Sequence, residues 1–222
     1  MHTHSEEFQQ SLTPKMALEV LKDGNKRFIN NLKINRNLLQ QVNDTANSQH
    51  PFAVVLSCMD SRTSVELIFD QGLGEIFSIR VAGNVVNDDI LGSMEYACKV
   101  AGSKLIVVLG HTKCGAIKGA CDQVEMGHLT GLLHKVHPAI ETTRSGEKQF
   151  LNIPFSEKVA HANVHNSINE ILNQSSIISE LFEQGKIGIA GGMYSVENGS
   201  VHFIKELFNQ HPAEKVLHQS IS

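Results

Sequence analysis

Short runs of uninterrupted apolar residues recur along the chain, and segments with helical periodicity separate them. The runs cover residues 52–56, 105–109 and 187–190. A strand that is buried on both faces has such a continuous apolar run, and strands that alternate with helices favour a parallel sheet with right-handed crossovers. Residues 76–81 predict a further strand. The pattern therefore predicts an α/β protein with a mostly parallel central sheet.

Several segments have the pattern of helices. Thr13 followed by a proline is typical of a helix N-terminus, and apolar residues at roughly helical spacing come after it. Residues 65–69 and 90–100 predict two shorter helices, and residues 156–184 predict a long helix that is broken near Ser175. These helices would flank the sheet.

The end of the chain predicts an antiparallel addition to the sheet. Residues 197–199 have the composition of a hairpin turn, and residues 201–204 would form its return strand. Two segments are less informative: residues 33–50 are polar with weak periodicity, and residues 127–149 form an excursion whose fold the pattern does not predict. Since no repeat or linker interrupts the chain, we expect one domain over residues 1–222.

Composition narrows the class of function. The chain is 41% hydrophobic and 19% charged with a formal net charge of -4, which gives no electrostatic reason to expect a nucleic acid partner. The amino-terminal stretch lacks the features of a signal peptide, and no apolar run is long enough for a membrane span, so we expect a cytoplasmic protein. The four cysteines are too few for a disulfide scaffold, and in a reducing compartment they indicate metal binding or catalysis.

Two polar motifs directly follow apolar strands. Cys58, Asp60 and Arg62 come after the strand at residues 52–56, and if the chain stays extended there, their side chains share one face. His111 and Cys114 come after the strand at residues 105–109, with a spacing that suits a tight turn into a helix. The carboxyl ends of neighbouring parallel strands meet at one edge of a sheet, so the two motifs can face the same point.

The residue types in these motifs suit zinc. Two thiolates and one imidazole are ligands that zinc favours, and three protein ligands leave the fourth tetrahedral position open for water, which is typical of a catalytic site. Asp60 could fill that position instead, but a bidentate pairing with Arg62 would hold its carboxylate off the metal. Cys58, His111 and Cys114 are therefore the candidate metal ligands, with Asp60 and Arg62 as a gate.

Other interpretations carry less weight. Taken singly, a cysteine at a strand end is usually a small buried residue and a histidine is usually a surface residue; only the combination favours a metal site. Gly110 and Gly115 have the spacing of a phosphate loop, but its lysine and hydroxyl residues are missing. Cys98 and Cys121 are better explained as packing residues. Three further histidines are expected to be solvated loop residues: His128, His134 and His137.

The paired motifs resemble the signature of beta-class carbonic anhydrases. The likeness runs from about residue 16 to residue 204 and includes the stretch 80–84 and the hairpin at 191–194. The resemblance implies a mostly parallel sheet with an antiparallel edge strand, an N-terminal helical arm over residues 1–35 that embraces a partner subunit, and a zinc-binding core over residues 50–205. It also implies a homodimer at least, with a homotetramer as the further option.

The resemblance also assigns roles to single residues. It makes Cys58, His111 and Cys114 the zinc ligands, one ion per subunit, and Asp60 and Arg62 the catalytic gating pair, with Asp60 as a fourth ligand in a closed state. Three residues fall at the spacings of the family's substrate cleft, which the neighbouring subunit partly lines: Gln49, Phe77 and Tyr96.

Two positions depart from patterns seen in the family. Some bacterial members hold a non-catalytic bicarbonate with a tryptophan three residues before the first cysteine; here that residue is Val55, and the chain contains no tryptophan. We therefore do not expect that form of bicarbonate inhibition. Val81 stands where many members have asparagine, which would alter the cleft near Phe77.

The resemblance implies a lyase that interconverts carbon dioxide and bicarbonate by attack of a zinc-bound hydroxide. Zinc lowers the pKa of its bound water to about 7, so the hydroxide is available near neutral pH. Two alternatives stay open. One is a zinc hydrolase of carbonyl sulfide or carbon disulfide, and the other is a non-catalytic zinc- or bicarbonate-binding protein in which Asp60 ligates the metal permanently.

Overall fold

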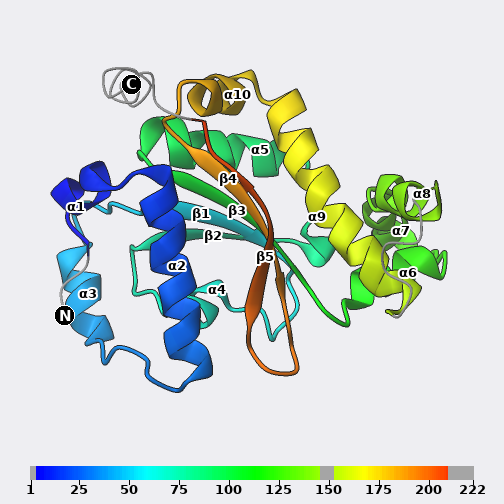
Figure 1. Ribbon diagram of the computed structural model, residues 1–222, viewed down its shortest axis with the longest axis horizontal. Helices are drawn as coiled ribbons and strands as arrows, with labels where there is room; N and C mark the ends of the chain where they lie inside the picture. Colours follow the sequence, from blue (N-terminus) through cyan, green and yellow to red (C-terminus); the bar gives the residue numbers. More distant parts are fainter. Residues whose placement is uncertain (1–3, 146–152, 210–222) are drawn as a thin grey trace, which may run out of the picture.

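A five-stranded sheet forms the centre of the protein. The computed structural model describes residues 4–145 and 153–209. The strands follow the spatial order β2-β1-β3-β4-β5, with β5 antiparallel to β4 and all other neighbours parallel (Figure 1). The mostly parallel sheet with an antiparallel edge strand is therefore confirmed. Its strands are β1 (Ala53–Ser57), β2 (Ile76–Arg80), β3 (Leu105–His111), β4 (Gly188–Tyr194) and β5 (Val201–Leu207).

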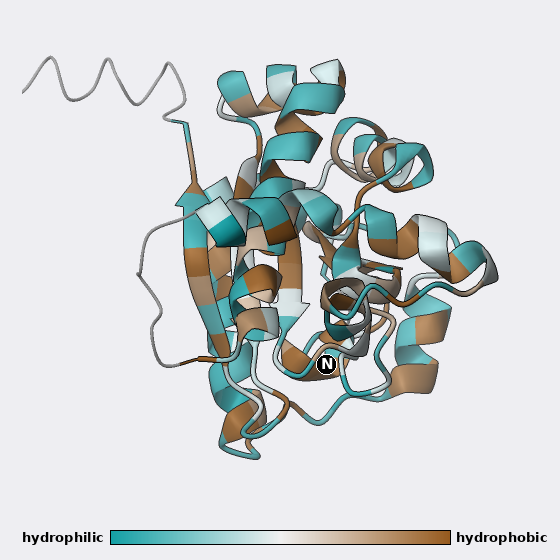
Figure 2. Cartoon of the chain, turned by 90° about the vertical axis from the view of Figure 1, so that its right-hand side faces the viewer, coloured by the Kyte–Doolittle hydropathy of each residue, from teal (hydrophilic) through white to brown (hydrophobic). Residues whose placement is uncertain are grey.

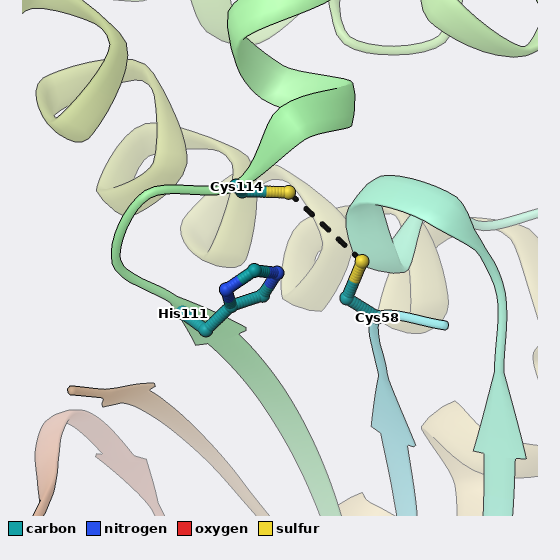
Figure 3. A group of neighbouring side chains, drawn as sticks. All are labelled: Cys58, His111 and Cys114. Atoms are coloured by element: carbon teal, nitrogen blue, oxygen red, sulfur yellow. Dashed lines mark hydrogen bonds between the residues drawn. The ribbon is translucent and has the colours of Figure 1, made fainter. Parts of the chain in front are cut away.

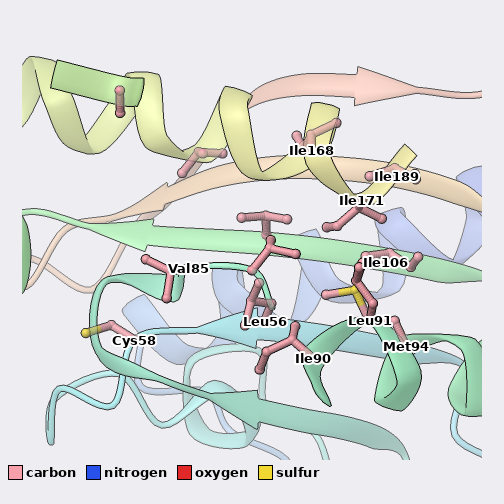
Figure 4. Close-up of a cluster of buried hydrophobic side chains, with 14 of the residues drawn as sticks. Leu56, Cys58, Val85, Ile90, Leu91, Met94, Ile106, Ile168, Ile171 and Ile189 are labelled. Carbon is pink, nitrogen blue, oxygen red and sulfur yellow. The ribbon is translucent and has the colours of Figure 1, made fainter. Parts of the chain in front are cut away.

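The two faces of the sheet bury two separate apolar clusters. Successive side chains of a strand point to opposite faces, so Val54 and Ile106 belong to one cluster while Val55 and Val107 belong to the other. Figure 4 shows the first cluster, in which strand residues meet residues of the covering helices. Full burial of one such side chain contributes roughly 1.5–3 kcal/mol. Burial on both faces explains why these strands have continuous apolar runs.

Helices cover both faces. The helices α2 (Pro14–Ile29) and α4 (Val65–Ile68) pack on the face that bears Val55, and the opposite face is covered mainly by α5, α6, α9 and α10 (Figure 1). Hydrophobic and hydrophilic stretches alternate along these helices, as expected when each buries one side (Figure 2). The second group consists of α5 (Asp88–Glu95), α6 (Gly115–Cys121), α9 (Phe155–Gln174) and α10 (Ser176–Glu183).

The N-terminal helices pack against the sheet of their own chain. After α1 (Glu6–Ser11), the side chain of Thr13 caps α2 by accepting a hydrogen bond from the backbone N–H of Met16 at 3.2 Å, as the sequence predicts. Ala17, Leu18 and Leu21 of α2 are fully buried. The contact of this arm with a partner subunit stays a prediction.

The break near Ser175 is confirmed. Ser175 ends α9 and caps α10, because its hydroxyl accepts a hydrogen bond from the N–H of Ile178 at 3.1 Å. The same hydroxyl donates to the Glu95 carboxylate at 2.6 Å. The helix predicted at residues 90–100 differs slightly, because α5 passes into a π-helical turn, η2 (Tyr96–Val100).

Three short helices form where the sequence pattern is weak. The polar segment 33–50 contains α3 (Leu38–Asp44), and the excursion contains α7 (Gly127–His134) and α8 (His137–Ser145); its residues 146–149 lie outside the described residues. The expectation of loop histidines was wrong: His128, His134 and His137 are exposed but helical. Tertiary packing decides these helices, since residues such as Leu133 and Ile140 are buried in the main cluster. None of the described helices is long and apolar enough to cross a membrane.

Candidate metal centre

The candidate ligands come from the carboxyl ends of two neighbouring strands. Cys58 directly follows β1, His111 is the last residue of β3, and Cys114 is the residue before α6. Ser57 pairs with Leu109 in the sheet, so both strands end at the same edge. Figure 3 shows the three side chains converging on one point. The structure thus brings together the three residues that the sequence analysis predicted to be metal ligands.

The geometry of the three residues fits a tetrahedral cation. Their ligand atoms lie within 4.8 Å of one another, and the two Sγ atoms are 3.9 Å apart. Two thiolates on one tetrahedral zinc, each about 2.3 Å from it, would be about 3.8 Å apart. All three side chains are buried, with 3%, 1% and 5% exposure for Cys58, His111 and Cys114. No other group of this kind occurs among the described residues.

The imidazole of His111 is oriented toward the same point. Its Nδ1 lies 2.9 Å from the Thr112 carbonyl oxygen, which can only accept, so Nδ1 carries the proton and Nε2 presents its lone pair. Nε2 is buried and has no hydrogen-bond partner in the structure. A buried nitrogen without a partner is costly, and a metal ion would satisfy it.

The two cysteines differ in acidity because they share a proton. The Cys114 thiol above all, followed by His111 and two backbone N–H groups, lowers the pKa of Cys58 to about 4 despite burial. The hydrogen bond to Cys58 and burial raise the pKa of Cys114 well above its usual range. Burial alone lowers the pKa of His111, but the neighbouring Cys58 outweighs it and raises the pKa overall. A divalent cation would replace the shared proton, since both sulfurs ligate as thiolates.

Backbone groups that the sequence did not single out complete the surroundings of Cys58. The N–H groups of Asp60 and Gly83 each donate to its Sγ at 3.4 Å. Gly83 has a φ of 70°, a conformation that favours glycine. Arg80 donates to the Cys58 carbonyl at 3.2 Å and to the Asp60 carbonyl at 2.6 Å. The only sequence signal for these roles was the 80–84 stretch of the resemblance.

Asp60 and Arg62 form the pair that the sequence predicts, but on a different backbone. Arg62 donates from Nε to Asp60 Oδ1 at 2.9 Å and from Nη2 to Oδ2 at 2.7 Å. The expectation of an extended chain was wrong: the Thr63 N–H donates to the Asp60 carbonyl at 2.9 Å, which closes a turn over residues 60–63. This turn, and not strand alternation, brings the two side chains together.

The Asp60 carboxylate is ionised and held apart from the ligand group. The hydrogen bonds from Arg62 keep the pKa of Asp60 far below its usual range, although burial opposes this shift. Asp60 is not among the residues whose ligand atoms lie within 4.8 Å of one another. The ionised carboxylate can therefore act only as a hydrogen-bond acceptor.

The residues assigned to a substrate cleft lie in two separate hollows of this chain. Phe77 and Tyr96 pack edge to face with ring centroids 6.3 Å apart, in a hollow of about 620 Å³ beside the edge strand β2. Gln49 lines another hollow of about 270 Å³ together with His4 and Asp44. None of the three metal-binding candidates lines either hollow. Their role in substrate binding therefore stays a prediction that needs a second subunit.

The other two cysteines pack as the sequence predicts. Cys98 is buried in the main apolar cluster, and burial raises the pKa of its thiol to about 12. Cys121 is partly buried at the end of α6. Val55, at the position of the missing tryptophan, is fully buried in the second cluster.

Fold and site together define an α/β protein with a Cys, His, Cys group that could hold a metal ion at the carboxyl edge of its sheet. Residues 53–201 match the family described as carbonic anhydrase. Carbonic anhydrase 2 of Mycobacterium tuberculosis is 35% identical over 194 residues, which cover 84% of this chain and 90% of that protein. The carbonic anhydrase of Mycolicibacterium smegmatis is 34% identical over 200 residues, covering 87% and 95%.

Solved structures show the same fold. The Coccomyxa beta-carbonic anhydrase in complex with acetazolamide has a TM-score of 0.67 at 23% identity and covers 81% of this chain and 87% of that one. The beta-carbonic anhydrase CcaA also has a TM-score of 0.67, at 22% identity, with 86% and 99% covered. The chain therefore belongs to the carbonic anhydrase family of enzymes, in its beta class.

Proposed function

We propose that the protein catalyses the reversible hydration of carbon dioxide to bicarbonate and a proton, with one zinc ion held by Cys58, His111 and Cys114. The observation that carries this proposal is the convergence of two sulfurs and an imidazole nitrogen within 4.8 Å beside an ionised Asp60. When bound, zinc would lower the pKa of a water molecule to about 7 and so supply a hydroxide nucleophile near neutral pH.

Asp60 would orient the nucleophile through the acceptor position that Arg62 leaves free. A carboxylate offers about four lone-pair positions. Arg62 fills three of them, through its backbone N–H at 3.0 Å and its two guanidinium N–H groups. The remaining position lies on Oδ2 and can accept one hydrogen bond. Such a fixed acceptor directs a reactant's proton away from the carbon that is attacked.

Self-association is part of the proposal. Structures of beta-carbonic anhydrases from Sordaria macrospora are described as tetrameric. In this chain, six large apolar side chains of the N-terminal segment are exposed, which is typical of a protein interface: Met16, Ile29, Leu32, Leu38, Leu39 and Val42. We propose a homodimer in which Gln49 of one subunit reaches the site of the other, with a homotetramer as the larger assembly. The cytoplasmic location stays a prediction.

The pairing of Asp60 with Arg62 favours catalysis over a closed zinc-binding module, because it holds the carboxylate away from the ligand group. The experiment is stopped-flow carbon dioxide hydration with a pH dye, before and after zinc is removed with a chelator and restored. Sulfide release from carbonyl sulfide and from carbon disulfide is measured in parallel. Fast hydration that zinc restores supports the proposal. Sulfide release without hydration would replace the substrate, and a zinc-loaded protein inactive in every assay would leave a binding role.

A further inference from the structure

Helix α9 contributes polar side chains to the surroundings of the candidate metal centre, although it holds none of the candidate ligands. At twenty residues it is the longest helix described, and it packs against β3, β4 and the turn that contains Gly83. Figure 1 shows it running from the region of α6 toward α10. Glu157 and Asn163, which lie on α9, form hydrogen bonds with backbone atoms of two different loops.

Glu157 holds the loop that carries two of the ligands. Lys113 lies between His111 and Cys114 and has a φ of 55°, in the left-handed region that L-residues rarely adopt. Its backbone N–H donates to Glu157 Oε1 at 2.7 Å. Its ammonium group pairs with Glu197 at 2.6 Å. A strained residue persists when its surroundings fix it, and Glu157 provides the contact to the backbone itself.

Asn163 holds the turn that contacts the third ligand. Its Nδ2 donates to the Gly83 carbonyl at 2.9 Å, and the N–H of Gly83 donates to Cys58 Sγ at 3.4 Å. Asn163 is only 3% exposed, so its amide is directed into the protein and not into solvent. One turn further along α9, Ser167 donates to the carbonyl of the next residue, Asn84, at 3.3 Å.

We propose that Glu157 and Asn163 are positioning residues that set the spacing of the candidate zinc ligands. Because one helix carries both contacts, it fixes the loop of His111 and Cys114 relative to the Gly83 turn, whose N–H contacts Cys58. The inference rests on the zinc-binding part of the proposed function. It does not depend on the identity of the substrate.

The test compares zinc affinity and ligand geometry in matched variants. Glu157→Ala removes the acceptor for Lys113, whereas Glu157→Gln keeps a side-chain oxygen at the same reach. Asn163→Ala removes the donor to Gly83. Glu170→Ala is the control, because Glu170 is also a partly buried glutamate of α9 and contacts neither loop. Zinc dissociation constants are measured by competition with a chromophoric chelator, and the absorption spectrum of the cobalt-substituted protein reports the coordination geometry.

We expect Glu157→Ala and Asn163→Ala to weaken zinc binding about tenfold or more and to change the cobalt spectrum, as loss of outer-shell contacts does in zinc sites. Glu157→Gln should restore most of the affinity, and Glu170→Ala should match the wild type. If both alanine variants bind zinc as tightly as the wild type with an unchanged cobalt spectrum, the inference is wrong. A wild-type protein that binds no zinc would instead overturn the proposed function. If Asn163→Ala does not fold, the zinc affinities and cobalt spectra of the two Glu157 variants decide whether the inference holds.

Discussion

The guanidinium of Arg62 holds the carboxylate of Asp60 in a two-point contact, with Nε 2.9 Å from Oδ1 and Nη2 2.7 Å from Oδ2. Paired N–H donors of this kind fix the plane of the carboxylate as well as its position. The contact keeps Asp60 charged and fixes its carboxylate outside the group of three candidate ligands. Several expected outcomes depend on it.

Asp60→Asn should retain zinc and lose most of the hydration activity. The amide cannot supply the fixed anionic acceptor, so we expect turnover to fall about 100-fold or more, while metal analysis shows unchanged zinc content. Asp122→Asn is the control, since Asp122 is exposed and pairs with Lys118 away from the site. Near-normal turnover in zinc-loaded Asp60→Asn would refute the role assigned to Asp60.

Arg62→Lys should reduce turnover, although the substitution keeps the positive charge. Lysine keeps the charge but cannot make the two-point contact, so the carboxylate of Asp60 gains freedom to reach the metal. We expect reduced turnover with full zinc occupancy, and a cobalt spectrum that indicates an added oxygen ligand. A spectrum and a rate equal to those of the wild type would show that charge alone suffices.

The cysteines should divide into ligands and packing residues. Cys58→Ser and Cys114→Ser should each lower the zinc content well below one per chain, because a serine hydroxyl is a far poorer zinc ligand than a thiolate. Cys98→Ala is the matched control, since Cys98 is buried but far from the ligand set. Metal analysis after dialysis checks this assignment; zinc loss in Cys98→Ala alone would contradict it.

The loss of folding stability at low pH should depend on Asp70. Asp70 is 4% exposed and accepts hydrogen bonds from Arg27 at 2.5 Å and Arg36 at 2.7 Å. Burial alone raises its pKa, but the two arginines and the Ile34 N–H outweigh it and lower the pKa in the folded state. Its contribution to the free energy of unfolding is therefore complete above the unfolded pKa of about 3.9 and disappears as pH falls through the folded pKa.

Urea unfolding at fixed protein concentration tests whether the contribution of Asp70 to the free energy of unfolding is lost as pH falls. At pH 7, Asp70→Asn should reduce the free energy of unfolding by about 1.5–3 kcal/mol, since it removes the charge from the two ion pairs that Asp70 forms with the partly buried Arg27 and Arg36. The difference from the wild type should shrink below about pH 4. A difference that stays constant down to the acid transition, or that grows, would show that Asp70 is not the titrating group.

Mixing two inactive variants tests whether the site is shared between subunits. Gln49→Ala and Cys58→Ser each disable both sites of a homodimer if Gln49 serves the partner's metal. A mixed dimer then keeps one intact site, so refolding an equal mixture should recover about one quarter of wild-type turnover. No recovery despite confirmed exchange of subunits would place Gln49 outside the partner's site.

Sequence patterns identified most of the sheet and the three candidate ligands, which the structure brings together. β1 and β3 are buried on both faces, so their apolar runs are continuous, and Cys58, His111 and Cys114 follow those runs where parallel strands must end together. The predicted strands agree with the observed ones within a few residues. These features could be predicted because an apolar run and the residue types that follow it can be read from a short stretch of sequence.

Short helices and the geometry around the ligands could not be predicted in the same way. α7 has little amphipathic pattern of its own and is held by the burial of residues such as Leu133. The pair Asp60 and Arg62 was predicted, but the turn that joins them was not. Neither failure concerns the identity of a residue. Both concern a conformation that several distant contacts select.

The sequence by itself determined the fold class, the candidate ligand set and the pairing of Asp60 with Arg62, because periodicity and residue chemistry are local properties. Only the tertiary structure decided that Gly83 donates to Cys58 and that α9 contacts both the loop of His111 and Cys114 and the Gly83 turn. Those contacts join backbone groups to residues as many as 80 positions away. A backbone N–H or carbonyl is present at every non-proline position, so nothing in the sequence marks which one will be used until the chain folds.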